Sequence, residues 1–127
     1  MTLSEPRGDP RHRLGSLGEE AAARALRKAG LKILERRFRV RAGEIDLIAK
    51  LGELIVFVEV KTRRGTDFGY PAEAVTATKR RRLARVALHY LTRHGWLDRP
   101  SRFDVVEVIA GGDEVRSVRH FEDAFRP

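Results

Sequence analysis

One run of eight residues constrains the fold more than any other part of the sequence. Residues 54–61 read Leu-Ile-Val-Phe-Val-Glu-Val-Lys, and β-branched and aromatic side chains of this kind favour a β-strand because they pack well on a pleated surface. A face that is open to water seldom runs through so apolar a strand. The run therefore predicts a strand in the interior of the fold.

The residues before this run predict a helix followed by two more strands. Apolar side chains recur every three or four residues from Leu14 to Ala29, and Gly30 follows as a helix-stop signal. Alternating apolar residues then predict strands over 31–40, 44–51 and 53–62. Because the breaks between these strands are short, tight antiparallel connections are expected.

The residues after the run predict a helix and a hairpin. After a loop at 65–71, a helix is expected over 72–93, with an apolar stripe and a strongly basic outer face. Two strands over 102–110 and 115–121 flank the Gly111–Asp113 turn. The sequence thus predicts an α/β fold, with a sheet flanked by helices in the order α-β-β-β-α-β-β.

Length and composition limit the kind of protein this can be. A chain of 127 residues has room for one core, so we expect a single domain over 14–127 and a loose arm over 1–13. No apolar run approaches a membrane span and no export signal is visible, which predicts a cytoplasmic protein with no membrane partner. The sequence has no cysteine, and its four histidines lack metal-ligand spacing. Any metal ion must therefore be held by oxygen atoms.

The charge of the chain points to a polyanionic partner. There are 26 Lys and Arg residues against 18 Asp and Glu residues, a net charge of +8. A field of this sign attracts nucleic acid through counterion release. A well-solvated thermostable surface would have the same composition, so the charge supports a nucleic-acid partner without establishing one.

Three ionisable residues interrupt the two most apolar strands. Burying an unpaired charge is costly, so Asp46, Glu59 and Lys61 need a reason to be there. Glu59 and Lys61 share a strand face, and a turn at Leu51-Gly52 would put Asp46 opposite Phe57, on that same face. Two carboxylates can then hold Mg²⁺ or Mn²⁺ beside an ammonium group, which suits phosphodiester hydrolysis. The alternative is a cross-strand ion-pair ladder on a solvated face.

Other charged residues extend this pattern. Helical spacing puts Glu19 at the edge of the apolar stripe, as a further metal ligand, whereas residues 16–19 also match a capping box in which Glu19 only caps the helix. Arg63 continues the face of Lys61, and Lys79 begins the basic side of the second helix, so both are expected to hold phosphates or to be solvated surface charges. Asp104 is expected to pair with a basic residue in a structural role.

Four blocks of the sequence resemble a known family. They are Leu17 to Ala22, Gly43 to Ile48, Val56 to Arg63 and Arg102 to Val105. In order and spacing they are similar to the YraN-like family of bacterial proteins, which is placed within the PD-(D/E)xK nuclease superfamily near the archaeal Holliday-junction resolvases. Ile45 stands where the motif has its proline, as in resolvase relatives.

The resemblance implies a restriction-endonuclease-like fold with a mixed central sheet. It implies that Asp46, Glu59, Glu19 and the backbone carbonyl of Val60 bind the metal, with Lys61 as the catalytic lysine, and that the protein is a homodimer. The leading hypothesis is a metal-dependent endonuclease acting on DNA at branched or damaged structures. A non-catalytic nucleic-acid-binding protein that keeps the nuclease fold is the alternative, and an RNA-processing enzyme is a third hypothesis.

Overall fold

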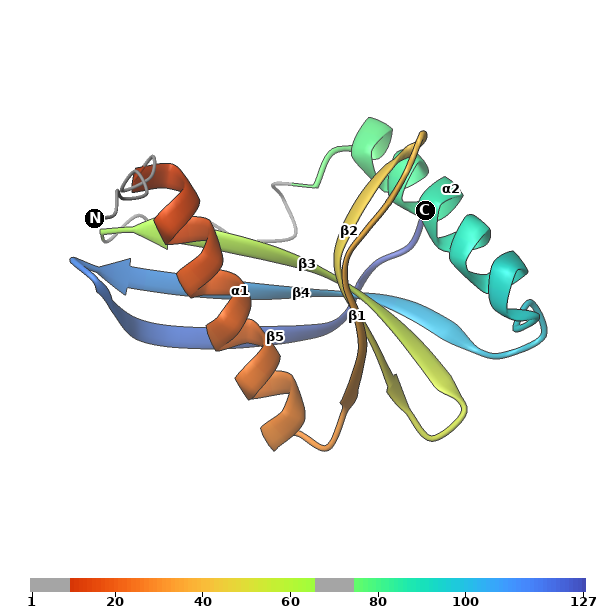
Figure 1. Ribbon diagram of the computed structural model, residues 1–127, viewed down its shortest axis with the longest axis horizontal. Helices are drawn as coiled ribbons and strands as arrows, with labels where there is room; N and C mark the ends of the chain where they lie inside the picture. Colours follow the sequence, from red (N-terminus) through yellow and green to blue (C-terminus); the bar gives the residue numbers. More distant parts are fainter. Residues whose placement is uncertain (1–9, 66–74) are drawn as a thin grey trace, which may run out of the picture.

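The computed structural model describes residues 10–65 and 75–127 and confirms the predicted order of elements (Figure 1). The elements are α1 (Pro10–Lys28), β1 (Lys32–Val40), β2 (Gly43–Leu51), β3 (Leu54–Arg64), α2 (Ala77–His94), β4 (Ser101–Gly111) and β5 (Glu114–Phe125). The Gly111–Asp113 turn lies between β4 and β5, as the sequence predicts. No helix in the described ranges is both long and apolar enough to cross a membrane.

The five strands form one mixed sheet in the order β1-β2-β3-β4-β5. β3 and β4 run parallel, whereas the other neighbouring pairs are antiparallel. Two parallel strands need a long connection between them, and α2 lies in that connection. The prediction of a mixed sheet with two helices is therefore confirmed.

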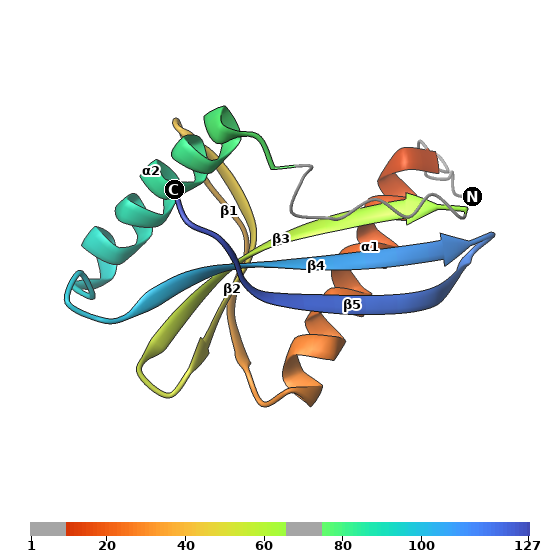
Figure 2. The same ribbon diagram turned by 180° about the vertical axis from the view of Figure 1, so that it is seen from behind.

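The two helices cover opposite faces of the sheet. Along β3, Val56 and Val58 belong to the core cluster beneath α1, whereas Ile55 and Phe57 belong to the cluster beneath α2. Successive side chains of a strand point to opposite faces, so this alternation places one helix on each side. Figure 2 shows α1 behind β3 and β4, and α2 beside the β1–β2 end of the sheet.

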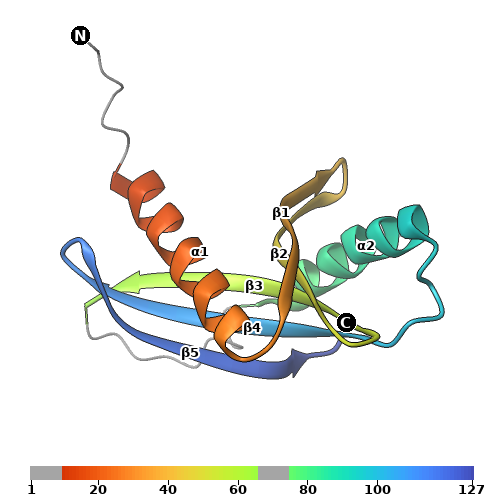
Figure 3. The same ribbon diagram turned by 60° about the horizontal axis from the view of Figure 1, so that its bottom comes forward.

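The β1–β2 hairpin bends away from the rest of the sheet. The β2–β3 ladder ends at the pair Leu47 and Val58, and beyond it the two strands part (Figure 3). Ile45 packs in the α2 cluster but Leu47 packs in the α1 cluster, although residues two apart in a regular strand share a face. The regular alternation of side chains along β2 is therefore interrupted at Asp46. On β1, Arg37 lies at the same level and has a left-handed backbone, with φ of 52°.

The helix boundaries differ from those that the sequence predicts. α1 begins at Pro10, four residues before Leu14, and proline is well suited to a first helical turn, where its missing N–H costs nothing. α2 begins at Ala77, because Thr76 caps it by accepting a hydrogen bond from the Lys79 N–H at 3.2 Å. The expected start of this helix at 72, most of the 65–71 loop, and the arm before Pro10 lie outside the described residues.

Candidate functional site

Asp46 lies where β2 and β3 part, and its carboxylate is held by the backbone of β3. Its Oδ2 accepts a hydrogen bond of 2.8 Å from the N–H of Val60. The expectation that Asp46 lies opposite Phe57 is wrong, because Phe57 pairs with Ile48. The turn falls one residue later than expected, after a Leu51–Leu54 pair, which shifts every partner by two residues. A shift of two keeps the face, so Asp46 still lies beside Glu59.

Glu59 is the buried acidic member of the site. Only 7% of it is exposed, and its Oε2 lies 2.5 Å from Nζ of Lys79 and 3.7 Å from Nζ of Lys61. Lys61 follows Glu59 by two residues along β3, whereas Lys79 comes from the first turns of α2, which the Thr76 cap holds in place. The site therefore joins three elements, β2, β3 and α2.

The acid and base groups of this site influence one another. Burial and the nearby negative charge of Glu59 raise the pKa of Asp46 to about 7. Burial and the positive charge of Lys79 lower the pKa of Lys61. Burial is the largest influence on Lys79 and acts to lower its pKa, but the hydrogen bond with Glu59 and the charges of Glu59 and Asp46 act together with Lys61 to give a net upward shift. Such mutual shifts in a group of convergent side chains are typical of functional sites.

The oxygen atoms between β2 and β3 fit a small, hard cation. Asp46 and Glu59 supply two carboxylates, and Mg²⁺ commonly binds one or two carboxylates together with water and substrate oxygens. The N–H of Val60 points toward Asp46, and in an antiparallel arrangement the carbonyl of the same residue faces the same way. The Val60 carbonyl, which was predicted as a ligand, is thus expected on the side of β3 that faces Asp46. Within the described residues no group of three or more His, Cys, Asp or Glu side chains is arranged to hold a metal ion.

Glu19 does not cap α1, and its side chain instead forms an ion pair with Arg37. It lies in the middle of the helix, so the capping-box interpretation is wrong: α1 already includes Ser16. Its Oε1 accepts a hydrogen bond of 2.9 Å from Nε of Arg37. Its negative charge is near enough to contribute to the raised pKa of Asp46. Its role as a metal ligand stays a prediction.

Two charged residues beside the site, Glu107 of β4 and Arg119 of β5, were missed by the sequence interpretation. Arg63, which was predicted, lies on the same face, with Nε 3.8 Å from Oε2 of Glu107. Glu107 on β4 is fully buried, and it binds Arg119 of β5 through two hydrogen bonds to Oε1. The signal for Glu107 was available, because it interrupts the apolar run 105–110 just as Glu59 interrupts its own strand.

Asp104 belongs to a separate network on the other face of the sheet. It pairs along the sheet with Val58, whose side chain lies beneath α1. The carboxylate is fully buried and accepts hydrogen bonds from Arg102 at 2.9 and 3.2 Å and from the Asp123 N–H at 2.9 Å, while His120 Nε2 lies 2.7 Å away. Burial acts to raise the pKa of Asp104. The hydrogen bonds from His120, Asp123 and Arg102 together outweigh burial, so the net shift of this pKa is downward. The expected pairing with a basic residue is confirmed.

Fold and site together define an α/β protein with two carboxylates and two lysines grouped where two strands of a mixed sheet diverge. The model of the uncharacterised protein family UPF0102 matches residues 18–108. The chain therefore belongs to this family, as the YraN-like resemblance predicts. A UPF0102 protein of Symbiobacterium thermophilum, STH1475, is 55% identical over 113 residues, covering 89% of this chain and 96% of the relative.

Other relatives carry the same family description. A UPF0102 protein of Caldicellulosiruptor saccharolyticus is 50% identical and covers 88% of this chain and 96% of its own length. The UPF0102 protein RHA1_ro06551 of Rhodococcus jostii is 48% identical, with coverage of 88% and 95%. These names give a family and no activity, so the function has to be argued from the site.

Proposed function

We propose that this protein is a metal-dependent nuclease that hydrolyses phosphodiester bonds of DNA, with a site of the PD-(D/E)xK type. The observation that carries the proposal is the convergence of Asp46, Glu59 and Lys61 at the divergence of β2 and β3, with the Val60 peptide binding Asp46. An ion-pair ladder on a wet surface would not explain why Glu59 is buried or why the pKa of Asp46 is raised.

Each side chain has a distinct role in this proposal. Asp46 and Glu59 bind a Mg²⁺ or Mn²⁺ ion, with the Val60 carbonyl and Glu19 as further candidate ligands. The ion supplies Lewis-acid polarisation of the phosphoryl oxygen and lowers the pKa of a bound water. Lys61 orients the attacking water and offsets the negative charge that develops on the phosphoryl group. Its lowered pKa makes the ammonium a better proton donor to the leaving oxygen.

The proposed substrate is DNA, at branched or damaged positions. Support comes from the net charge of +8 and from the phosphate-binding candidates Arg63 and Lys79, which lie on the face of the site. A homodimer belongs to the same proposal, because a four-way junction has twofold symmetry that a symmetric dimer matches. Sedimentation of the protein with and without junction DNA checks this part.

The test is cleavage of labelled junction, flap and duplex DNA with Mg²⁺, with Mn²⁺ and with chelator. We expect metal-dependent products from the wild type, and a loss of at least about 100-fold in Lys61→Ala and Asp46→Asn, because each removes a group used in the transition state. Lys28→Ala, which removes an exposed lysine from the end of α1, is the matched control and keeps full activity. Equal cleavage by wild type and Lys61→Ala would identify a contaminant and refute the proposal.

A second candidate function is a non-catalytic nucleic-acid-binding protein that keeps the same fold. One observation favours it: two lysines already neutralise Glu59, so the pocket of the described structure is balanced without a metal ion. This function predicts salt-sensitive DNA binding that survives Asp46→Asn, and no heat of Mn²⁺ binding in calorimetry. Comparing ribose with deoxyribose substrates separates an RNA-processing enzyme from both.

A further inference from the structure

Glu107 is a buried carboxylate that the proposed chemistry does not use. It lies in the apolar middle of β4 with no exposed surface. Both hydrogen bonds it accepts within the described residues come from Arg119 and end on Oε1, and Oε2 receives none there. A carboxylate in such a place is destabilising unless cations surround it. Positively charged neighbours are therefore needed to stabilise Glu107 in this position.

Those neighbours form a row of charges across three strands. Lys61 of β3 pairs with Glu107 of β4, which in turn pairs with Arg119 of β5. Directly paired residues project from the same face, so the buried carboxylate sits between two cations. Arg63, two residues further along β3, adds a third, with Nε 3.8 Å from the free oxygen Oε2. Because Lys61 also pairs with Glu59, the two arginines alone leave a surplus of one positive charge around Glu107.

Within the described ranges, neither arginine beside Glu107 uses all of its N–H donors on that carboxylate. Arg119 uses Nε and one terminal nitrogen, and Arg63 lies beyond hydrogen-bond distance of Glu107. The side chain of Arg119 is 48% exposed and that of Arg63 is 26% exposed, so both are partly open to solvent. Guanidinium groups bind phosphate oxygens through paired N–H donors, and a carboxylate behind them fixes their orientation.

The position of the arginines relative to the candidate site sets what they can bind. Lys61 lies next to both Glu59 and Glu107. Arg63 comes two residues later on β3 and on the same face, which is a distance of about 6.7 Å along the strand. This distance is similar to that between neighbouring phosphates of an extended nucleic-acid strand. We infer, on the basis of the proposed function, that Glu107 anchors a phosphate-binding fork of Arg63 and Arg119, which takes the backbone phosphates next to the reacting one.

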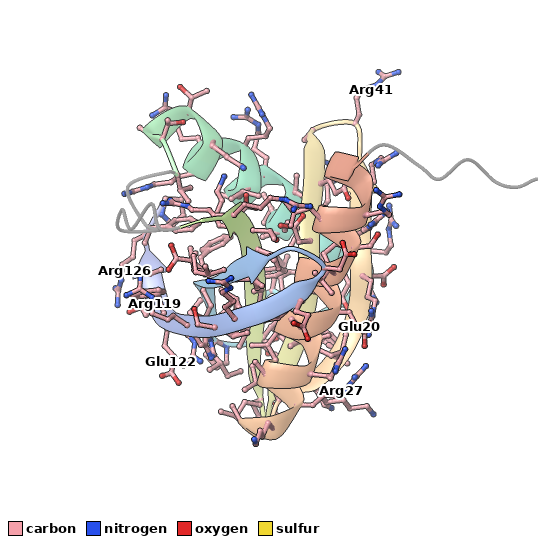
Figure 4. All side chains as sticks on the ribbon, turned by 90° about the vertical axis from the view of Figure 1, so that its left-hand side faces the viewer. Glu20, Arg27, Arg41, Arg119, Glu122 and Arg126 are labelled. Atoms are coloured by element: carbon pink, nitrogen blue, oxygen red, sulfur yellow. The ribbon has the colours of Figure 1, made fainter. Side chains whose placement is uncertain are left out.

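The test measures binding and cleavage separately. Binding of fluorescein-labelled single-stranded and duplex DNA is followed by anisotropy in chelator at several salt concentrations, for Arg63→Ala and Arg119→Gln. Glutamine keeps a donor for Glu107 and removes the charge, so the variant is expected to fold. The matched control is Arg27→Ala, since Arg27 is an exposed arginine of α1 on the opposite side of the molecule from Arg119 (Figure 4).

We expect each fork variant to reduce the slope of log K against log salt by about 0.7–0.9, the loss of one phosphate contact, with circular dichroism unchanged. The control keeps the wild-type slope, and Arg119→Lys recovers it. Wild-type slopes in both fork variants, or no salt-dependent binding by the wild type, would overturn the inference. Absence of cleavage with reduced slopes would refute the nuclease and leave the fork. Metal-dependent cleavage with unchanged slopes would do the reverse.

Discussion

At the scale of single residues, the molecule concentrates electrostatic strain at Asp46. Its carboxylate is partly buried beside Glu59, and among the residues that the structure describes its one hydrogen-bond donor is the Val60 N–H. A raised pKa in the folded state means that folding is opposed by ionisation of this group. A site that binds a cation benefits from this arrangement, because the ion replaces the proton.

We predict that Asp46→Asn stabilises the metal-free protein at pH 8. The pKa of Asp46 rises from 3.8 to about 7 on folding, so its contribution is most favourable below pH 4 and is lost as the pH rises through 7. Asparagine keeps an acceptor for the Val60 N–H and removes the charge, for a gain on the order of 1–3 kcal/mol. Urea unfolding at pH 5 and pH 8 measures it, and a gain that does not grow with pH would contradict the assignment.

Lys79 provides a second prediction at this scale. Because its Nζ binds Glu59, Lys79→Met removes the closest counter-charge of a buried carboxylate. We expect a loss of about 1–3 kcal/mol in unfolding free energy without metal, and recovery of most of it when Mn²⁺ is added. Thermal unfolding with and without Mn²⁺ measures both effects, and Arg81→Met, at an exposed position of the same helix, is the control. A loss that Mn²⁺ leaves unchanged would argue against metal binding at Glu59.

At the scale of elements, α1 approaches β3 so closely that at one position any side chain larger than that of glycine would force a neighbouring group to move. A Cβ atom at Gly18 would lie 1.9 Å from Oγ1 of Thr62. The helix backbone therefore touches the strand that carries Glu59 and Lys61.

We predict that Gly18→Ala destabilises the fold by about 1–3 kcal/mol, since β-branched Thr62 has little freedom to move. Gly15→Ala, in the same helix with nothing within 4 Å of the added atom, should instead stabilise by about 0.5–1 kcal/mol. Chemical denaturation of both variants measures this. Thr62→Ala should relieve part of the defect, and full additivity of the two changes would show that the contact is not its cause.

Sequence patterns were sufficient for the elements and insufficient for some of their partners. Apolar periodicity is local, so all seven elements and the face shared by Asp46 and Glu59 could be predicted. The two-residue error in the β2–β3 register arose because the turn uses Gly52, with φ of 61°, as its first central residue. Glu107 could have been noticed because it interrupts an apolar run, but its closeness to Lys61 and Arg63 depends on the parallel β3–β4 pairing, which joins residues about fifty positions apart.

At the scale of the whole molecule, the sheet has three inner strands, β2, β3 and β4, and two edge strands, β1 and β5. Ile55 to Val58 and Val105 to Val108 lie in β3 and β4, and apart from Glu107 their side chains are buried and apolar. β1 and β5 pair on one side only. We therefore expect these two segments to be the most stable part of the sheet, and the candidate site begins directly beyond one of them, at Glu59.

We predict that native-state hydrogen exchange is slowest in the amides of 55–58 and 105–108 and fastest, among the strands, in β1. Strands paired on both sides open only with global unfolding, whereas an edge strand frays locally. Exchange measured by mass spectrometry at peptide resolution, with and without Mn²⁺, checks the order. Protection of Lys32–Val40 equal to that of the central strands would contradict it.

The hydrogen bond between Asp46 and the Val60 N–H has a consequence for errors in folding. A slip of β2 against β3 by one residue would bring Ile45 or Leu47 to the place of Asp46, and every side chain of the strand would turn to the wrong face. The same slip would bury the carboxylate or expose the core. A misaligned hairpin would therefore lose its buried apolar contacts and the carboxylate of the candidate site together, so this hydrogen bond favours the one register that keeps both.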